Sequence, residues 1–474
     1  MAKQKLVEHR PTVDELLAKA KKPSLLSPPL HKFYGGKLQV MPKCSIEGYQ
    51  DFAIWYTPGV AAACKEIQAS PEKAFEYTNK SNFVAIVSNG TRVLGLGNIG
   101  PEAGLPVMEG KSILFKYLGG VDAFPLCLNT RDPEEIIRTC EILQPTFGGI
   151  NLEDIEKPQC FYILEEARKR LKIPVWHDDQ QGTATVVLAG LINAYKLVGK
   201  DPKNSLITLV GAGAANMRTA YVLMKWGVKP GNILMVDTKG LIYPGRADIK
   251  EEDDRWKYEL SQITNAEGRR GDMEASFKGV DAVVGAAKPG PDVIKKEWIK
   301  TMADDPIVFA CANPIPEIWP WDAEEAGAKI VATGRSDFPN QVNNSLGFPG
   351  IFRGVLDVRA TTVTDDMCVA AALELAKFAE ARGITEKDIT PHMDEWQVYP
   401  LVAVACAQKS MEQGLARIKP SADDLYEHAV EVIKRARGCT DLLMKHGDIA
   451  QRPSEKQILG QEEPKFPVHL HGSG

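Results

Sequence analysis

Short apolar segments alternate with helix-like segments along much of this chain, and this alternation restricts the fold more than any other feature of the sequence. The clearest series has five apolar runs, most of them followed by turn residues and a helical pattern: residues 205–210, 233–237, 281–285, 307–312 and 329–332. Strands separated by helices form parallel sheets with helices on both faces. We therefore expect an α/β protein whose central part is a doubly wound parallel sheet.

The part of the chain before residue 182 shows a second, weaker series. Residues 146–151 and 173–177 predict strands on either side of a helix at 158–171, which is a β-α-β unit. Residues 83–88 and 92–96 flank Asn89-Gly90-Thr91, and we expect a hairpin there because Asn-Gly tolerates a positive φ. Residues 1–45 are rich in proline and have one short helical pattern at 13–20, so we expect a packing arm.

Only helical patterns follow residue 354, at 368–382, 401–413 and 422–437. The length of 474 residues fits about three domains of roughly 150 residues each. We expect an N-terminal α/β domain over residues 1–181, a Rossmann-like domain over 182–354, and a C-terminal helical segment over 355–474 that packs on the other two.

Composition excludes several classes of protein. The formal net charge of −5 is small and negative, which argues against a sequence-independent nucleic-acid binder. No apolar run reaches the roughly 18 residues of a membrane span, and the first residues lack the apolar core of a signal peptide. Nine cysteines without a CxxC pair fit neither a disulfide framework nor a thiolate metal site. We expect a cytoplasmic protein with no nucleic-acid or membrane partner.

A glycine-rich turn follows the run at 205–210 and opens a helix. It contains Gly211, Gly213, Ala214, Ala215 and Asn216. Such a turn lets backbone N–H groups approach a pyrophosphate at a helix N-terminus, and a carboxylate at the end of the next strand can accept ribose hydroxyls. Asp237 occupies that position, 26 residues after Gly211. Asn216 replaces the third glycine of the usual pattern, and similar turns also occur in α/β proteins that bind no nucleotide.

Four acidic residues follow two strands that we expect to be neighbours. Glu153 and Asp154 come after the strand at 146–151, and Asp178 and Asp179 come after the strand at 173–177. Parallel neighbours would gather these carboxylates at one edge of the sheet, where a cation offsets their repulsion, and oxygen ligands suit Mg²⁺ or Mn²⁺. Alternatively, one pair caps the helix that begins near residue 180. We expect the adjacent His177 to be a packed core residue.

Two further residues have ambiguous patterns. Lys111 is expected in the first turn of its helix, where the helix dipole disfavours an ammonium and a neutral lysine can act as a base; nearby carboxylates would oppose that shift. An ordinary exposed lysine is the alternative. Tyr56 precedes a Pro-Gly turn and is either a packed aromatic residue or a proton donor. The residues alone leave both open.

Taken together, these motifs resemble the malic enzyme family. The segments that carry the resemblance are YTPGVA at 56–61, SNGTRVLGLG at 88–97, GK at 110–111, LED at 152–154, HDDQQGTA at 177–184, ANP at 312–314 and NN at 343–344. They occur in the order of the family and spread from about residue 50 to 355. The chain length is similar to that of the small-subunit branch.

The resemblance implies oxidative decarboxylation of L-malate to pyruvate and CO₂, with NAD⁺ or NADP⁺ and a divalent cation. It makes residues 1–181 the malate- and metal-binding domain and 182–354 the NAD(P)-binding domain. By this analogy the metal ligands are Glu153, Asp154 and Asp179, the base is Lys111, and the proton donor is Tyr56. The analogy also implies that Asp178 hydrogen-bonds Lys111, and that the malate carboxylates are held by Arg92, Asn313 and one of Asn343 or Asn344.

Several alternatives stay open. A malolactic conversion of malate to lactate would use the same metal and dinucleotide, and a non-catalytic nucleotide- or carboxylate-binding sensor could keep the same fold. Asp237 ordinarily favours NAD⁺, but Lys239 and Arg246 follow closely and could neutralise the 2′-phosphate of NADP⁺. A homodimer is the default expectation for the oligomeric state.

Overall fold

The computed structural model describes residues 12–93 and 95–460, and the ten residues at the start of the chain, used above to argue against a signal peptide, lie outside this part. The chain forms two compact units. The larger one is Lys43–Ala436, and the smaller one is made of the segments before and after it. Among the described residues, no helix combines the length and the apolar character that a membrane crossing requires.

The smaller unit joins the two ends of the chain. Helix α1 (Val13–Tyr34) begins with a capping box between Thr12 and Glu15, and the Tyr34 hydroxyl donates to the carbonyl of Ala450 at 3.1 Å. The short helix α17 (Glu455–Ile458) and the end of α16 (Ala422–His446) belong to the same unit. Helix α1 is longer than the predicted helix at 13–20, because it continues through three prolines.

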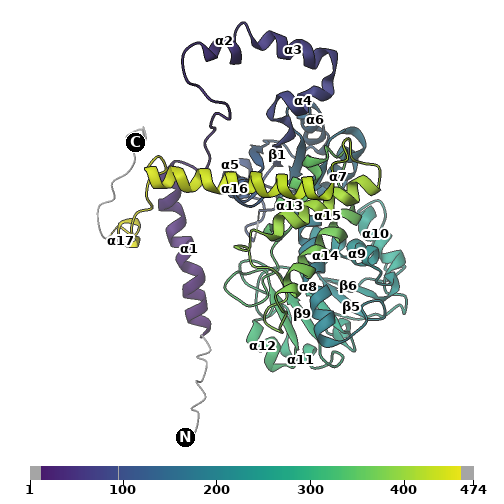
Figure 1. The fold of residues 1–474 in the computed structure, drawn as a ribbon. Helices are drawn as coiled ribbons and strands as arrows, with labels where there is room; N and C mark the ends of the chain where they lie inside the picture. The colour runs from purple at the N-terminus through teal and green to yellow at the C-terminus, as the bar shows by residue number, and fades with distance from the viewer. Residues whose placement is uncertain (1–11, 94, 461–474) are drawn as a thin grey trace. The chain divides into compact units, whose positions relative to one another are not determined.

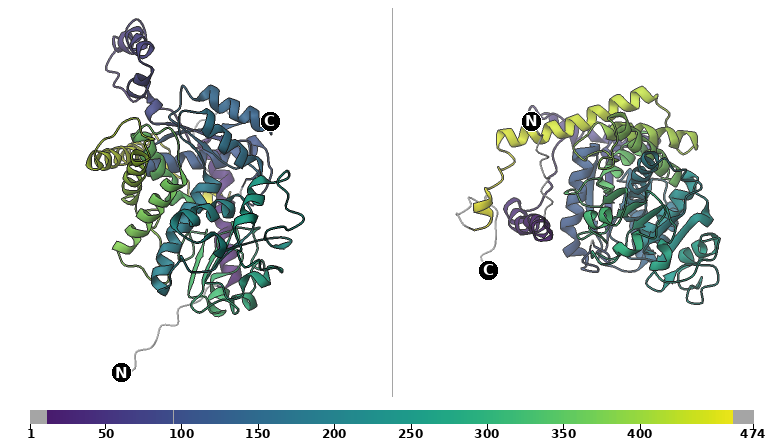
Figure 2. Two further views of the ribbon diagram at one scale, coloured as in Figure 1. Left: turned by 90° about the vertical axis from the view of Figure 1, so that its right-hand side faces the viewer. Right: turned by 90° about the horizontal axis from the view of Figure 1, so that it is seen from below.

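The first sheet has four parallel strands in the order β2-β1-β3-β4. These are β1 (Phe83–Ser88), β2 (Asp122–Cys127), β3 (Gly149–Leu152) and β4 (Val175–His177), and the helices between them are α5 (Pro101–Gly119), α6 (Pro133–Leu143) and α7 (Gln159–Arg170). Leu152 pairs with His177, so β3 and β4 end at the same edge of the sheet. Before β1 come α2 (Asp51–Trp55), α3 (Val60–Ala69) and α4 (Ala74–Tyr77). Helices α2 and α3 extend away from the sheets, whereas α4 lies close to them (Figures 1 and 2).

The predicted hairpin at 83–96 is wrong. Strand β1 has parallel neighbours on both sides, β2 and β3, so no edge is left for a returning strand. After β1 the chain turns at Gly90 (φ +66°), where a Cβ would lie 2.1 Å from the carbonyl oxygen of Gly100. The Asn-Gly signal therefore marks a close-packed turn that leads towards α5.

The second sheet has the order β10-β9-β8-β5-β6-β7, and only the short β7 is antiparallel. Its strands are β5 (Ile207–Val210), β6 (Ile233–Asp237), β7 (Gly240–Leu241), β8 (Ala282–Gly285), β9 (Ile307–Ala310) and β10 (Ile330–Thr333). Around it lie α8 (Thr183–Val198), α9 (Ala214–Trp226), α10 (Arg255–Ile263), α11 (Lys296–Ile299) and α12 (Pro320–Glu325). The predicted α/β class, with a doubly wound parallel sheet, is confirmed.

The remaining helices of the larger unit pack against the two sheets and their helices. They are α13 (Phe348–Asp357), α14 (Asp365–Ala381), α15 (Val398–Glu412) and the first part of α16. Helices α13 and α15 approach closely, since a Cβ on Gly354 would lie 2.1 Å from the carbonyl oxygen of Ala403. The Asn193 amide on α8 donates to the carbonyls of Ala376 and Ile389, both at 2.9 Å. The boundaries at residues 181 and 354 stay a prediction.

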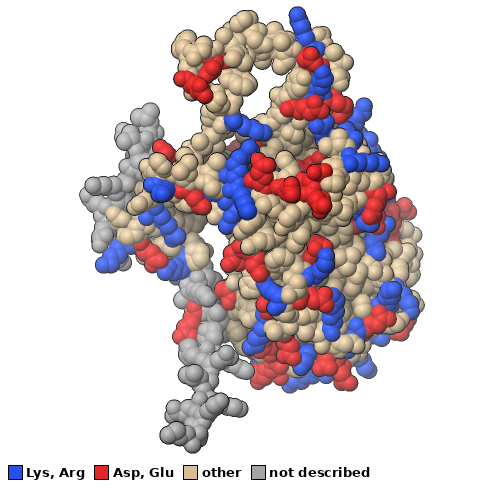
Figure 3. Space-filling model, in the orientation of Figure 1, with Lys and Arg blue, Asp and Glu red and all other residues tan. Residues whose placement is uncertain are grey.

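Acidic and basic side chains are interspersed over the face shown in Figure 3. This mixture agrees with the small net charge of the sequence.

Candidate active site

Three carboxylates converge at the edge where β3 and β4 end. Glu153, Asp154 and Asp179 each offer an oxygen, and these oxygens lie within 4.8 Å of one another. The backbone fixes this arrangement: Asp154 has a positive φ of 54°, its N–H donates to Asp179 Oδ2 at 2.9 Å, and its carbonyl accepts the N–H of Arg92 at 3.0 Å. Burial first, and then the neighbouring acids, raise the pKa of Glu153, while Lys111 acts in the opposite direction.

A divalent cation fits this donor set. All three groups are carboxylates, which are ligands that Mg²⁺ and Mn²⁺ prefer, and a cation between them would relieve the repulsion that raises the pKa of Glu153. Glu153 is further held by the amide of Asn151, which donates to Oε2 at 2.8 Å. The sequence reasoning missed Asn151, which lies in β3 two residues before Glu153; this spacing was the available signal, because side chains two apart in an extended segment point the same way.

Lys111 lies beside the carboxylates and is buried. Its Nζ is 2.6 Å from Asp178 Oδ2, 3.0 Å from Glu153 Oε1 and 4.5 Å from the centre of the Phe348 ring. The expectation of a first-turn lysine is wrong: α5 begins at Pro101, so Lys111 lies in its interior. Burial lowers the pKa of Lys111, but Asp178 and Glu153 outweigh it and hold the pKa far above the ordinary value. Without a cation at the acids, Lys111 is therefore an ammonium.

Asp178 is fully buried and held from several sides. Trp176 Nε1 donates to Oδ1 at 3.0 Å, and Lys111 Nζ donates to Oδ2 at 2.6 Å. A Cβ on Gly182 would lie only 2.0 Å from Oδ1, so the backbone of the π-helical turn η3 (Asp178–Gly182) closes against the carboxylate. Sequence reasoning missed Trp176, whose i, i+2 spacing from Asp178 in an extended segment was the available signal.

The predicted carboxylate-holding residues come from three segments of the chain. Arg92 is exposed and follows β1, and Asn313 is exposed and follows β9. Asn344 lies on the same side of Gly182 as Asp178, since a Cβ added to Gly182 would be 3.2 Å from the Asn344 Cβ and 2.0 Å from Asp178 Oδ1. Asn343 instead caps the short helix η6 (Asn344–Leu346) by accepting the N–H of Ser345 at 3.0 Å. This geometry favours Asn344 over Asn343 as the site residue.

Tyr56 does not lie in a buried site with these residues. Tyr56 is 72% exposed, and neither α2 nor α3, on either side of it, has a buried residue. His177, in contrast, is fully buried, as expected. Burial lowers its pKa to about 3, so its imidazole is neutral at pH 7.

The glycine turn has the geometry that a pyrophosphate needs. Gly211 has φ +96°, and a Cβ there would lie 2.9 Å from the carbonyl oxygen of Ala286, whereas a Cβ on Gly213 would lie 3.9 Å from the same oxygen, an ordinary contact. Asn216 turns inward, and its amide donates to the carbonyls of Val210 at 2.8 Å and Val284 at 3.2 Å. The missing third glycine therefore does not block the turn, because the side chain of Asn216 lies between β5 and β8. The turn and its helix fit a dinucleotide.

One buried carboxylate joins the loops that follow β8 and β9. Glu317 Oε1 accepts the N–H of Ala287 at 2.9 Å, and Oε2 accepts the N–H of Ala312 at 3.0 Å. Burial raises the pKa of Glu317. Sequence reasoning missed this residue, which lies four positions after Asn313 in the same loop.

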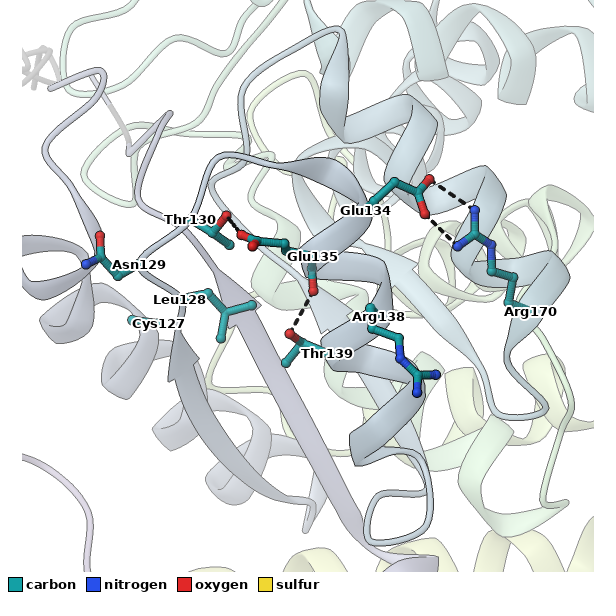
Figure 4. Close-up of a pocket in the computed structure, with 9 residues that line it drawn as sticks. All are labelled: Cys127, Leu128, Asn129, Thr130, Glu134, Glu135, Arg138, Thr139 and Arg170. Carbon is teal, nitrogen blue, oxygen red and sulfur yellow. Dashed lines mark hydrogen bonds and ion pairs between the residues drawn. The ribbon is translucent and has the colours of Figure 1, made fainter.

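The glycine turn and the acidic cluster adjoin each other. Lys157 follows the cluster in sequence, and its Nζ donates to the carbonyl of Ala212 in the turn at 2.7 Å. Arg218 on α9 donates to the Gln180 side chain of η3 at 3.3 Å. A shallow pocket at the end of β2, lined by Thr130, Glu134 and Arg170 among others, is separate from this site and contains none of the predicted site residues (Figure 4).

Comparison with known proteins decides the family. The sequence model of the malic enzyme N-terminal domain matches residues 35–168, and that of the malic enzyme NAD-binding domain matches residues 180–411. The chain belongs to the malic enzyme family. The predicted resemblance is thereby confirmed.

Individual malic enzymes are similar over most of their length. The bifunctional malic/malolactic enzyme of Bacillus subtilis is 47% identical over 84% of this chain and 95% of its own length. The NAD-dependent malic enzyme of Geobacillus stearothermophilus is 46% identical over 81% of this chain and 78% of its own. The crystal structure of Entamoeba histolytica malic enzyme superposes with a TM-score of 0.92, at 44% identity, over 96% of this chain and 94% of its own.

Proposed function

We propose that this malic enzyme oxidises L-malate and releases CO₂ to give pyruvate at the site where the acidic cluster meets the glycine turn. The observation that carries this proposal is the meeting of three cation-binding carboxylates with the buried Lys111–Asp178 pair. When bound, the divalent cation polarises the C2 oxygen of malate and the nicotinamide accepts the hydride from C2.

The residues of the chain then have the following proposed roles. Glu153, Asp154 and Asp179 hold the cation, and Lys111 accepts the proton of the C2 hydroxyl. Lys111 loses the support of Glu153 once that carboxylate binds a cation, so its pKa falls towards the range of a base. Asp178, fixed by Trp176, keeps the Lys111 Nζ in place. Arg92, Asn313 and Asn344 hold the substrate carboxylates by charge-assisted and neutral hydrogen bonds.

The dinucleotide site of the proposal is the turn after β5. Gly211 makes the tight turn while its own N–H donates to the Val236 carbonyl, and Gly213, Ala214 and Ala215 would bring backbone N–H groups to the pyrophosphate. Asn216 supports the turn through its side-chain amide, and Asp237 would face the adenosine end of the cofactor. At the nicotinamide end the proposal assigns Asn313, which follows Ala312 in the loop that Glu317 holds.

We propose a homodimer as the working form. Ile46, Tyr49, Phe52, Ile54, Trp55, Tyr56 and Val60 are all exposed large apolar residues within one short stretch, and such a concentration is typical of a protein interface. In the dimer, the stretch from Ile46 to Val60, called the exposed arm below, packs on the second copy, and Tyr56 protonates C3 of the enol in the site of that copy. We also propose a cytoplasmic location, which the nine free cysteines favour.

The test is turnover of the purified chain with malate, Mn²⁺ and either dinucleotide. The expected products are pyruvate and the reduced dinucleotide in equal amounts, and chelation by EDTA abolishes both until Mn²⁺ is restored. Activity that persists in EDTA would contradict the metal role. The malolactic alternative, favoured by the name of the Bacillus relative, instead gives lactate with no net reduced dinucleotide. If the chain is instead a non-catalytic sensor, it should bind malate and show no turnover with either dinucleotide.

A further inference from the structure

The carboxylate expected to recognise the cofactor ribose is already occupied by side chains of this chain. Asp237 ends β6 and is mostly buried. Its Oδ1 accepts from Arg246 Nη1 and from the N–H of Lys239, both at 2.9 Å. Its Oδ2 accepts from Arg246 Nη2 and from Lys257 Nζ, the latter at 2.5 Å.

These four contacts use the full accepting capacity of Asp237. An ionised carboxylate has two oxygens with about four lone-pair sites in all, and each oxygen here already receives two donors. Burial acts to raise the pKa of Asp237, but the hydrogen bonds from Arg246 and Lys257 outweigh it and lower the pKa to about 2. The 2′- and 3′-hydroxyls of an unphosphorylated ribose would therefore have to displace a strong ion pair to reach this carboxylate.

The charges around Asp237 favour an additional anion. Arg246 also pairs with Asp248 through Nε–Oδ1 at 2.9 Å, and Lys239 pairs with Asp248 at 3.0 Å. Three basic and two acidic side chains form this group, which leaves one positive charge in excess. The Lys239 side chain is 66% exposed and the Lys257 side chain 18% exposed, so both ammonium groups can turn towards a ligand beside β6.

We propose that the adenosine end of this site selects a ribose carrying a 2′-phosphate, so that NADP⁺ binds more tightly than NAD⁺. The inference rests on the proposed function, because it needs a dinucleotide on the turn after β5. Arg246 and Lys257 cancel the repulsion that Asp237 would exert, and Lys239 and Lys257 provide the charge that the phosphate pairs with. Asp237 thus acts by holding the side chains of Arg246 and Lys257 in position.

Calorimetric titration of the full chain tests this without turnover. We expect NADP⁺ to bind at least tenfold more tightly than NAD⁺, which corresponds to about 1.4 kcal/mol. Adenosine 2′,5′-bisphosphate should show the same preference over adenosine 5′-monophosphate, from which it differs only by the 2′-phosphate. Added salt should weaken NADP⁺ binding more than NAD⁺ binding, because charge pairs near the surface are screened.

Two variants locate the effect. Lys257→Met should weaken NADP⁺ binding about tenfold and leave NAD⁺ binding within a factor of two, in line with a charge-assisted contact. Lys229→Met is the matched control: Lys229 precedes the opposite end of β6 and donates to Asn204, so its loss should change neither affinity.

Equal or tighter binding of NAD⁺ would overturn the inference, and so would a Lys257→Met variant that weakens both dinucleotides equally. The proposed function fails in a different way: a correctly folded chain would then bind neither dinucleotide, and this inference would fall with it.

Discussion

At the residue scale, Asp178 shows how a buried carboxylate is kept in one position. It accepts hydrogen bonds from Trp176 and Lys111, and the backbone at Gly182 leaves no space beside it. The Asp178 side chain is therefore held in one conformation, and its hydrogen bond to Lys111 holds the Lys111 Nζ in place.

Gly182→Ala should reduce malate turnover about 100-fold, since its Cβ would lie 2.0 Å from Asp178 Oδ1 and would push the carboxylate away from Lys111. Steady-state kinetics and circular dichroism measure activity and folding separately. Gly104→Ala, on the same helix as Lys111 and with no neighbour closer than 3.7 Å, should keep its activity. Full activity of Gly182→Ala would contradict the positioning role of Asp178.

Asp179→Asn should weaken Mn²⁺ binding by at least about tenfold. Mutating a group that merely orients a metal ligand typically costs about 10–100-fold in metal affinity, and the loss of a ligand itself should cost at least as much. Dinucleotide binding should be unchanged, since the glycine turn lies on the other sheet. Calorimetry with Mn²⁺ and with the dinucleotide measures both. The exposed Asp423→Asn is the control, and loss of both affinities in Asp179→Asn would indicate misfolding instead of a ligand role.

At the element scale, strand order explains which parts of the site the sequence could predict. Glu153, Asp154 and Asp179 were placed together because parallel neighbours end at one edge, and the pairing of Leu152 with His177 bears this out. The hairpin at 83–96 failed because a local turn signal carries no information about which strands flank β1. Lys111 was placed in a first turn because Gly and Pro residues inside α5 read as helix boundaries.

Contacts between elements that are far apart in the chain could not be predicted from the sequence. Lys239 and Arg246 were visible near Asp237 because they follow it closely in the chain, but Lys257 comes from α10 and reaches Asp237 only through packing. Trp176 and Glu317 likewise became evident only from the partners they contact.

Helices α13 and α15 offer a test of element packing. Gly354→Ala should lower the free energy of unfolding by about 1–3 kcal/mol, because its Cβ would lie 2.1 Å from the Ala403 carbonyl oxygen and would force the helices apart. Urea unfolding measures the change. Gly438→Ala, in α16 with nothing within 4 Å, should instead raise stability by up to about 1 kcal/mol. Equal effects of the two changes would mean that α13 and α15 are not in close contact.

At the scale of the whole molecule, the exposed arm around Tyr56 leads to a test of shared sites. Tyr56→Phe and Lys111→Ala should each be nearly inactive alone. If Tyr56 serves the second copy, mixing them under conditions that exchange subunits should restore up to about a quarter of wild-type activity, because half of the dimers then contain one intact site. Light scattering should confirm a dimer.

The arm itself provides the control for that experiment. Trp55→Asp should weaken the dimer and prevent the recovery, since it places a charge on an apolar surface. No recovery in mixtures of proven mixed dimers would contradict the sharing of Tyr56.

The two hydrogen bonds of Glu317 have a mechanical consequence. Because one side chain accepts hydrogen bonds from the backbone at Ala287 and at Ala312, the loops after β8 and β9 are mechanically linked. Ala312 is bonded to Asn313, the residue proposed to reach malate. A displacement of either loop would thus be transmitted through Glu317 to the backbone next to Asn313, although Glu317 is not among the residues proposed to contact either ligand.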